Sequence, residues 1–92
     1  MSATASPVAA CRIRVRGVVQ GVGFRPFVHR LALRHHLGGW VQNASGEVTV
    51  LVEGSDEAIS EFLVALRAEA PALARIETLQ VESAEPTGVS SF

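Results

Sequence analysis

The chain has 92 residues, of which 48% are hydrophobic and 18% are charged, and its formal net charge is -1 at pH 7. These values are typical of one small soluble domain with a thin core. No apolar run approaches the roughly 20 residues that span a bilayer, which excludes a membrane protein of the helical kind. The first residues lack the basic start and apolar centre of a secretory signal, and Cys11 is the single cysteine. We therefore expect a cytoplasmic protein without an internal disulfide.

Basic and acidic residues are segregated along the chain. Six of the eight basic residues precede residue 35, and all nine acidic residues lie from Glu47 onward. This asymmetry favours an anionic ligand on the first half of the chain. It is equally compatible with two halves that neutralise each other once the chain has folded.

In the first half, residues 1–10 are small and uncharged and are interpreted as a flexible tail. Apolar and charged residues alternate over residues 11–16, which predicts a half-buried strand followed by a glycine-rich loop. Apolar residues then recur at helical spacing over residues 24–35. Pro26 suits the first turn of this helix, and Gly38 suits the position just past its end.

The second half predicts a hairpin, a helix and a strand. Residues 40–43 and 47–53 are interpreted as two strands around a short turn, with Glu53 on the polar face of the second. Ser55 is the expected N-cap of a second helix that ends before Pro71. Residues 75–82 have the composition of a last strand.

The order of these elements is strand, helix, strand, strand, helix, strand. It predicts an α+β fold, a ferredoxin-like βαββαβ sandwich with two helices on one face of a four-stranded antiparallel sheet. We assign the domain to residues 11–83 and residues 84–92 to a linker or to the start of a truncated final strand. The first and second strands of such a sheet run parallel, about 10 Å apart, with the third between them. The loop after the first strand and Asn43 at the end of the second are therefore expected at the same edge.

The loop before the first helix has the composition of a phosphate site. Gly21 and Gly23 permit positive φ angles, so that successive N–H groups can turn inward and form an anion nest. The helix that begins near Phe24 adds its unsatisfied N–H groups, and Arg25 adds a planar cation that matches phosphate oxygens. Pro26 follows where the dinucleotide-binding pattern would continue, and no nucleotide P-loop sequence is present. The glycines alone support a phosphate site and a structural turn equally.

Two segments resemble the signature motifs of the acylphosphatase family. They are Val19-Gln20-Gly21-Val22-Gly23-Phe24-Arg25 and Gly39-Trp40-Val41-Gln42-Asn43. The similarity extends over residues 12–82. Within the family, residues 25–28 and 71–77 look most like one branch, the N-terminal acylphosphatase-like domain of the nickel–iron hydrogenase maturation carbamoyltransferases.

This resemblance implies a role for each matching residue. Arg25 would bind the phosphate and stabilise charge on the transferring group, and Asn43 would hold the attacking water. The phosphate oxygens would be bound by backbone N–H groups of the loop, namely Gln20, Gly21, Val22, Gly23 and Phe24. The implied reaction is the hydrolysis of an acyl phosphate, carbamoyl phosphate in this branch, as the first step of carbamoyl transfer in hydrogenase maturation.

The resemblance also implies no metal, no cofactor in this domain and no covalent intermediate. The expected partners are further domains of the same longer chain and a hydrogenase-maturation acceptor protein. Two alternatives remain open: a free-standing acylphosphatase of broad substrate range, and a regulatory domain that binds phosphate without turnover. An assay with an acyl phosphate would separate them.

Other residues are given no chemistry. Cys11 is interpreted as inert core, and His29 and His36 have no further ligands at metal-site spacing. Trp40 is expected in the core or at the mouth of the site. RNA binding would need exposed aromatic residues on the central strands. Residues such as Ile13 occupy those positions instead, so we expect no nucleic-acid partner.

Overall fold

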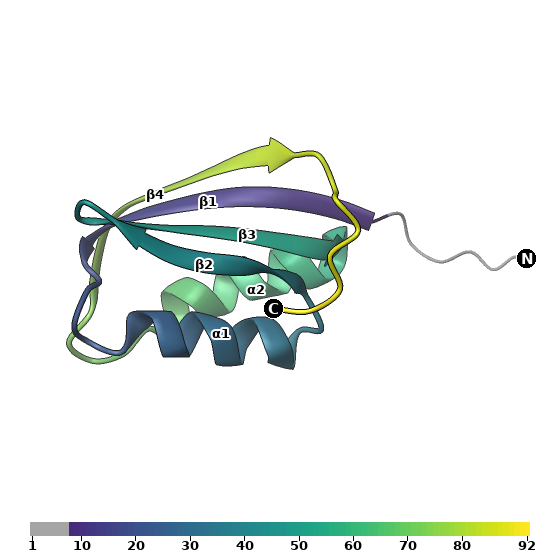
Figure 1. Ribbon diagram of the computed structural model, residues 1–92. Coiled ribbons are helices and arrows are strands. Elements are labelled where there is room, and N and C mark those ends of the chain that lie inside the picture. Colours follow the sequence, from purple (N-terminus) through teal and green to yellow (C-terminus); the bar gives the residue numbers. More distant parts are fainter. Residues whose placement is uncertain (1–7) are drawn as a thin grey trace, which may run out of the picture.

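The computed structural model describes residues 8–92. Their elements are β1 (Val8–Val18), α1 (Phe24–Arg34), β2 (Gly38–Ala44), β3 (Glu47–Ser55), α2 (Asp56–Ala68) and β4 (Arg75–Ala84). The strands form one sheet in the order β2-β3-β1-β4, in which every neighbouring pair is antiparallel. Both helices cover the same face of this sheet (Figure 1). The predicted ferredoxin-like sandwich is thereby confirmed.

The core lies between the helices and the two central strands, β1 and β3. Successive side chains of a strand point to opposite faces, so the alternating apolar residues of both strands face the helices. The fully buried ones from the strands are Ile13, Val15, Val48, Val50 and Val52. The helices contribute Phe24 and Val28 from α1, and Phe62 and Leu66 from α2. Neither helix within residues 8–92 has the length and hydropathy of a membrane-spanning segment.

The start of β1 corrects the predicted boundary at residue 10. Val8, Ala9 and Ala10 already pair with β3, and Ala10 is buried. The small uncharged side chains of these residues do not prevent strand formation, because backbone pairing does not need charged or bulky side chains. The part of the tail prediction that concerns residues 1–7 lies outside the described residues.

The end of α1 also differs from the prediction. The left-handed residue after the helix is His36, with φ 58°, and not Gly38. Gly38 is instead the first residue of β2, where an added Cβ would lie 2.2 Å from the carbonyl oxygen of Val89. Close approach of the C-terminal segment, and not helix capping, therefore requires glycine at this position.

The hairpin and the second helix form as predicted. Ser45 and Gly46 both have positive φ, 47° and 79°, as a two-residue turn between twisted strands requires. Ser55 caps α2, because its Oγ accepts a hydrogen bond from the N–H of Ala58 at 3.1 Å.

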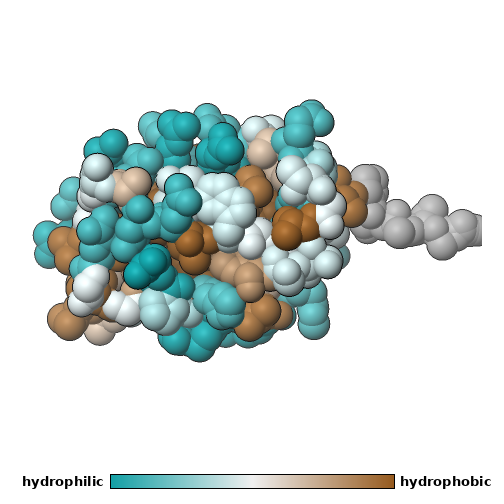
Figure 2. Space-filling view, in the orientation of Figure 1, coloured by the Kyte–Doolittle hydropathy of each residue, from teal (hydrophilic) through white to brown (hydrophobic). Residues whose placement is uncertain are grey.

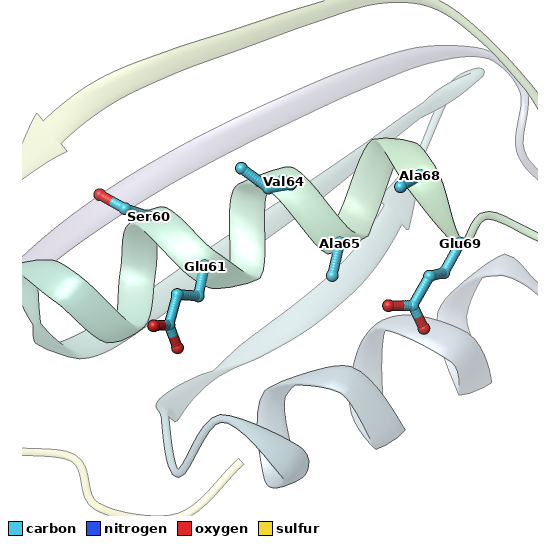
Figure 3. A pocket seen from close by; sticks show the side chains of 6 residues that line it. All are labelled: Ser60, Glu61, Val64, Ala65, Ala68 and Glu69. Atoms are coloured by element: carbon cyan, nitrogen blue, oxygen red, sulfur yellow. The ribbon is translucent and has the colours of Figure 1, made fainter.

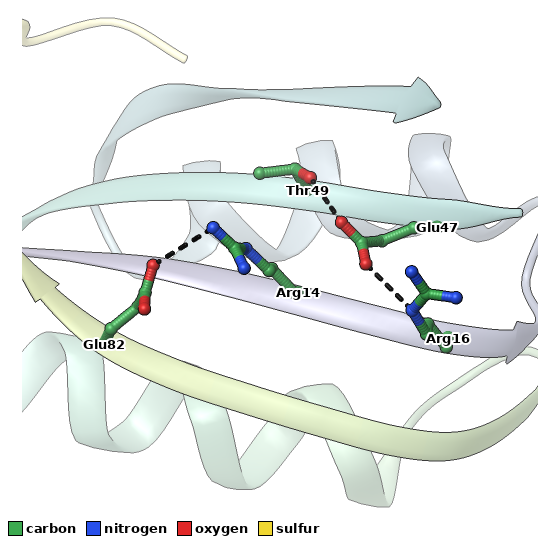
Figure 4. A network of polar contacts seen from close by, with 5 residues as sticks. All are labelled: Arg14, Arg16, Glu47, Thr49 and Glu82. Carbon is green, nitrogen blue, oxygen red and sulfur yellow. Dashed lines mark hydrogen bonds and ion pairs between the residues drawn. The ribbon is translucent and has the colours of Figure 1, made fainter. Parts of the chain in front are cut away.

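The face of the sheet away from the helices is mostly hydrophilic and lies along the top of the surface view (Figure 2). Arginines of β1 pair there with carboxylates of the neighbouring strands (Figure 4). Arg16 Nε lies 2.9 Å from Glu47 Oε1, and Arg14 Nη2 lies 3.4 Å from Glu82 Oε1. Such exposed pairs contribute about 0–1 kcal/mol each. Because arginines occupy these exposed positions of β1, this central strand lacks the exposed aromatic residues that RNA-binding sheets use.

Residues 85–92 pack against the domain, so the ordered unit extends past the predicted limit at residue 83. They pass the ends of β1 and β3 and finish between β2 and α1 (Figure 1). Glu53 anchors this segment. Its Oε2 accepts hydrogen bonds from the N–H and the hydroxyl of Thr87, at 2.9 and 2.6 Å, and its Oε1 accepts one from the N–H of Gly88 at 3.0 Å. The carboxylate expected on a polar face is thus only 3% exposed.

Glu53 should make folding pH-dependent. The hydrogen bond from the Thr87 hydroxyl, followed by those from backbone N–H groups, lowers the pKa of Glu53 below its ordinary value. The stabilisation is present above the ordinary glutamate pKa, about 4.3, and is lost as the pH falls through the lowered folded-state pKa. Urea unfolding measured between pH 7 and pH 3 should show a smaller loss of stability in Glu53→Gln than in the wild type. Glu85→Gln, an exposed carboxylate of the same segment, should keep the wild-type slope.

Candidate active site

The loop after β1, the start of α1 and the end of β2 enclose one small pocket. Its volume is about 190 Å³, and it is lined by Val19, Gly21, Gly23, Phe24, Arg25, Pro26 and Asn43. The two motifs of the sequence therefore meet in space. They meet because β1 and β2 both pair antiparallel with β3, so that their carboxyl ends lie at the same edge.

The loop is held at both ends by buried side chains. Val19 and Phe24 are each 1% exposed and pack in the core. Between them, Gly21 and Gly23 have φ angles of 72° and 80°, whereas Val22 is not among the residues with positive φ. When residues with positive and negative φ alternate in this way, neighbouring N–H groups can point to the same side and form an anion-binding nest. An added Cβ at either glycine would meet nothing within 4 Å, so conformation and not space requires glycine here.

The start of α1 is left open toward a ligand. Gly23 is its N-cap, no side chain caps the helix, and its first turn has no acidic residue. In α2, by contrast, Ser55 caps the helix and two acidic residues occupy the first turn. The first N–H groups of α1 and the positive end of its dipole are therefore available to an anion in the pocket.

Arg25, like Arg12 and Arg30, belongs to the arginines of the first half that form no ion pair among residues 8–92, and of these three only Arg25 lines the pocket. Arg14, Arg16 and Arg34 each form an ion pair with a glutamate of the second half. Within residues 8–92, Arg25 is exposed and takes part in none of the ion pairs. Pairing between the two halves thus accounts for those three arginines. The guanidinium of Arg25 remains without an ion-pair partner at the pocket.

Asn43 lies at the end of β2 and lines the same pocket. It is exposed, and no hydrogen bond of its side chain is found among the described residues. Trp40, by the alternation of the strand, belongs to the opposite face and does not line the pocket. The alternative that Trp40 shapes the mouth of the site is therefore not supported.

The remaining predicted residues of the loop have their side chains away from the pocket lining. Gln20 is exposed, and Val22 packs partly against the core. The role that the resemblance implies for both residues would be carried by their backbone N–H groups. It stays a prediction.

Two other kinds of site receive no support. Burial, followed by the nearby charge of Asp56, raises the pKa of the Cys11 thiol, which disfavours a reactive thiolate. Among residues 8–92, no group of three or more histidine, cysteine or carboxylate side chains is placed to hold a metal ion.

A larger hollow lies along α2 but has the wrong chemistry for an anion (Figure 3). Its volume is about 340 Å³, and it is lined by Ser60, Glu61, Val64, Ala65, Ala68 and Glu69. The lining holds two carboxylates and no cation. It would repel a phosphate, whereas the smaller pocket at Arg25 would attract one.

Comparison with known proteins shows the family to which this fold belongs. The acylphosphatase family model matches residues 11–92, and the chain belongs to that family.

Its relatives are of two kinds. The chain is 48% identical, over 95% of its length, to "Carbamoyltransferase HypF" of Rhizobium leguminosarum, of which it spans 11%. It is also 44% identical to the acylphosphatase of Moorella thermoacetica, with 84% of that protein covered. The chain thus spans about a tenth of the carbamoyltransferase and most of the free acylphosphatase.

The similar solved structures belong to the same two kinds of protein. Full-length HypF in its phosphate- and nucleotide-bound form superimposes with a TM-score of 0.94 at 34% identity, covering 99% of this chain and 12% of the other. The acylphosphatase of Bacillus subtilis superimposes with a TM-score of 0.87 at 35% identity, covering 91% of this chain and 94% of the other.

The nest can be tested through Gly21. In Gly21→Ala, the left-handed conformation costs about 1–2 kcal/mol, so the loop should shift and bind inorganic phosphate about tenfold more weakly in calorimetry. Gly46→Ala is a matched control, because it also has positive φ and an open Cβ direction but lies outside the pocket. We expect it to lose similar stability and to keep phosphate affinity. Equal affinities in both variants would contradict the nest.

Proposed function

We propose that this chain is an acylphosphatase domain that hydrolyses carbamoyl phosphate, as the first step of carbamoyl transfer in nickel–iron hydrogenase maturation. The observation that carries the proposal is the convergence of Arg25, Asn43 and the open start of α1 on one pocket. A cation, an amide and a set of N–H donors are the groups that a phosphoryl transfer to water needs.

The chemistry requires little more than positioning. The nest, the helix start and Arg25 hold the phosphoryl group and stabilise the charge that spreads over its oxygens. Asn43 orients a water whose oxygen attacks phosphorus, while the bond between phosphorus and the acyl oxygen breaks and the two protons of the water end on oxygens of the inorganic phosphate product. The leaving group takes the electron pair as a carboxylate, or as carbamate when the substrate is carbamoyl phosphate. Because this leaving group is stable, no strong general acid is needed, and the residues that line the pocket include none.

Carbamoyl phosphate and the further steps are supported by the carbamoyltransferase relatives. Their names state carbamoyl transfer, and one solved relative carries phosphate and nucleotide. In the proposal, further domains of the same longer chain consume the carbamate, and an acceptor protein of hydrogenase maturation receives the carbamoyl group.

A free-standing acylphosphatase of broad range is the second candidate. It is supported by relatives such as that of Moorella thermoacetica, of which the chain covers 84%. Rates with carbamoyl phosphate and benzoyl phosphate separate the candidates. A strong preference for the carbamoyl substrate supports the first, and similar kcat/KM values support the second. Phosphate binding without turnover of either would instead indicate a regulatory domain.

Arg25→Ala should abolish most of the activity. Loss of a preorganised charge at the transferring group lowers the rate by about a hundredfold or more, which can be followed as benzoyl phosphate hydrolysis. Arg30→Ala is the matched control, because Arg30 is an exposed residue of the same helix and does not line the pocket. Equal rates in both variants would refute the assigned role of Arg25.

Asn43→Ala should separate binding from turnover. Since the phosphate is held by the loop and α1, inhibition by inorganic phosphate should keep its Ki, while kcat falls by about a hundredfold. Gln42→Ala, one residue earlier on the opposite face of β2, should retain both values. A raised Ki with unchanged kcat in Asn43→Ala would assign Asn43 to phosphate binding instead of water.

A further inference from the structure

We propose that residues 87–92 form a strap, anchored by Glu53, that holds α1 against β2 and so positions Asn43 relative to Arg25. Glu53 is then a positioning residue of the reaction. The inference rests on the proposed function, because it assigns a catalytic consequence to the spacing between those two side chains.

The anchor lies on the face of the sheet away from the helices. Glu53 pairs with Ala10 of β1 and Gly38 of β2, at the end of the sheet opposite Asn43. Both of its carboxylate oxygens accept hydrogen bonds from the strap, two from Thr87 and one from Gly88. Hydrogen bonds to an ionised carboxylate are stronger than those between neutral groups, so the start of the strap is firmly held.

From the anchor, the strap crosses the edge of β2. The carbonyl oxygen of Val89 lies so close to Gly38 that an added Cβ would be 2.2 Å away. Two residues further on, the carbonyl oxygen of Ser91 accepts a hydrogen bond of 3.0 Å from the N–H of Gly39. These contacts fix the strap to the first two residues of the strand that carries Asn43.

The strap ends on α1. The ring of Phe92 meets that of His29 edge-on, with centroids 5.7 Å apart, and also packs against the core. His29 lies four residues after Arg25 on the same helix, so both residues occupy neighbouring turns of one side. The strap therefore contacts both elements that line the pocket, and it runs from one face of the sheet to the other (Figure 1).

This bridge matters because α1 and β2 are otherwise joined by side-chain packing and the short connection of residues 35–37. No strand pairing sets their separation. A displacement of about 1 Å between catalytic groups can cost a hundredfold in rate. Loss of the strap should move Asn43 against a phosphate that the loop and α1 still hold.

The test uses two variants that remove the anchor differently. Glu53→Gln and Thr87→Val should each lower kcat about tenfold, with the Ki of inorganic phosphate unchanged. Thr87→Ser keeps the hydroxyl and should retain the wild-type kcat. Glu85→Gln, a substitution at an exposed neighbour, should also leave kcat unchanged. If Glu53→Gln does not fold, Thr87→Val carries the test. Faster amide exchange at Gly39 should accompany the lower kcat, because the hydrogen bond to Ser91 is lost.

A double-mutant cycle separates positioning from stability. In an Asn43→Ala background, Thr87→Val should lower kcat no further, since the group that the strap positions is already absent. A variant that is less stable but has the wild-type kcat well below its melting temperature would overturn the strap alone. Absence of turnover in the wild type would overturn the proposed function, and with it the catalytic role of the strap.

Discussion

The antiparallel pairing of β3 with both β1 and β2 is the constraint on which the site depends. Because β3 lies between them, β1 and β2 run in the same direction and end at the same edge of the sheet. The loop that follows β1 and the last residues of β2 are thus neighbours, although about 20 residues separate Gly23 from Asn43 along the chain. The pocket therefore results from the order of the strands within a single domain.

Within that frame, most of the charge at the site belongs to the backbone. In the proposed reaction, the loop with its two left-handed glycines and the uncapped start of α1 would supply preorganised N–H donors for the phosphate. Arg25 adds a permanent charge that no neighbouring carboxylate neutralises among the described residues. Fixed dipoles and one guanidinium suit a reaction whose leaving group is already activated.

The strands and helices that frame the pocket could be predicted from the sequence because their signals are local. Alternation in β1, helical spacing after Phe24, and the Ser55 cap each depend on a few neighbouring residues. The misses involve contacts between distant segments. The close approach of Val89 to Gly38, and the burial of Glu53 by Thr87, join residues more than 30 positions apart. Alternation places Glu53 on the correct face of β3, but nothing near it in the sequence indicates that the C-terminal segment covers that end of the face. The expectation for Trp40 is wrong for another reason: residues 40 and 43 are three positions apart, so strand alternation alone already places their side chains on opposite faces.

The lack of an N-cap side chain on α1 lowers the stability of the domain. An N-cap side chain is worth about 0.5–2 kcal/mol, and α1 forgoes it because Gly23 must keep its conformation. In a domain of this size, that is a noticeable share of the total stability. An anion in the pocket satisfies the same donors, and anything that binds only the native state shifts the folding equilibrium toward it. Under the proposed function, the melting temperature of this protein would therefore rise with the concentration of its substrate and of the phosphate product.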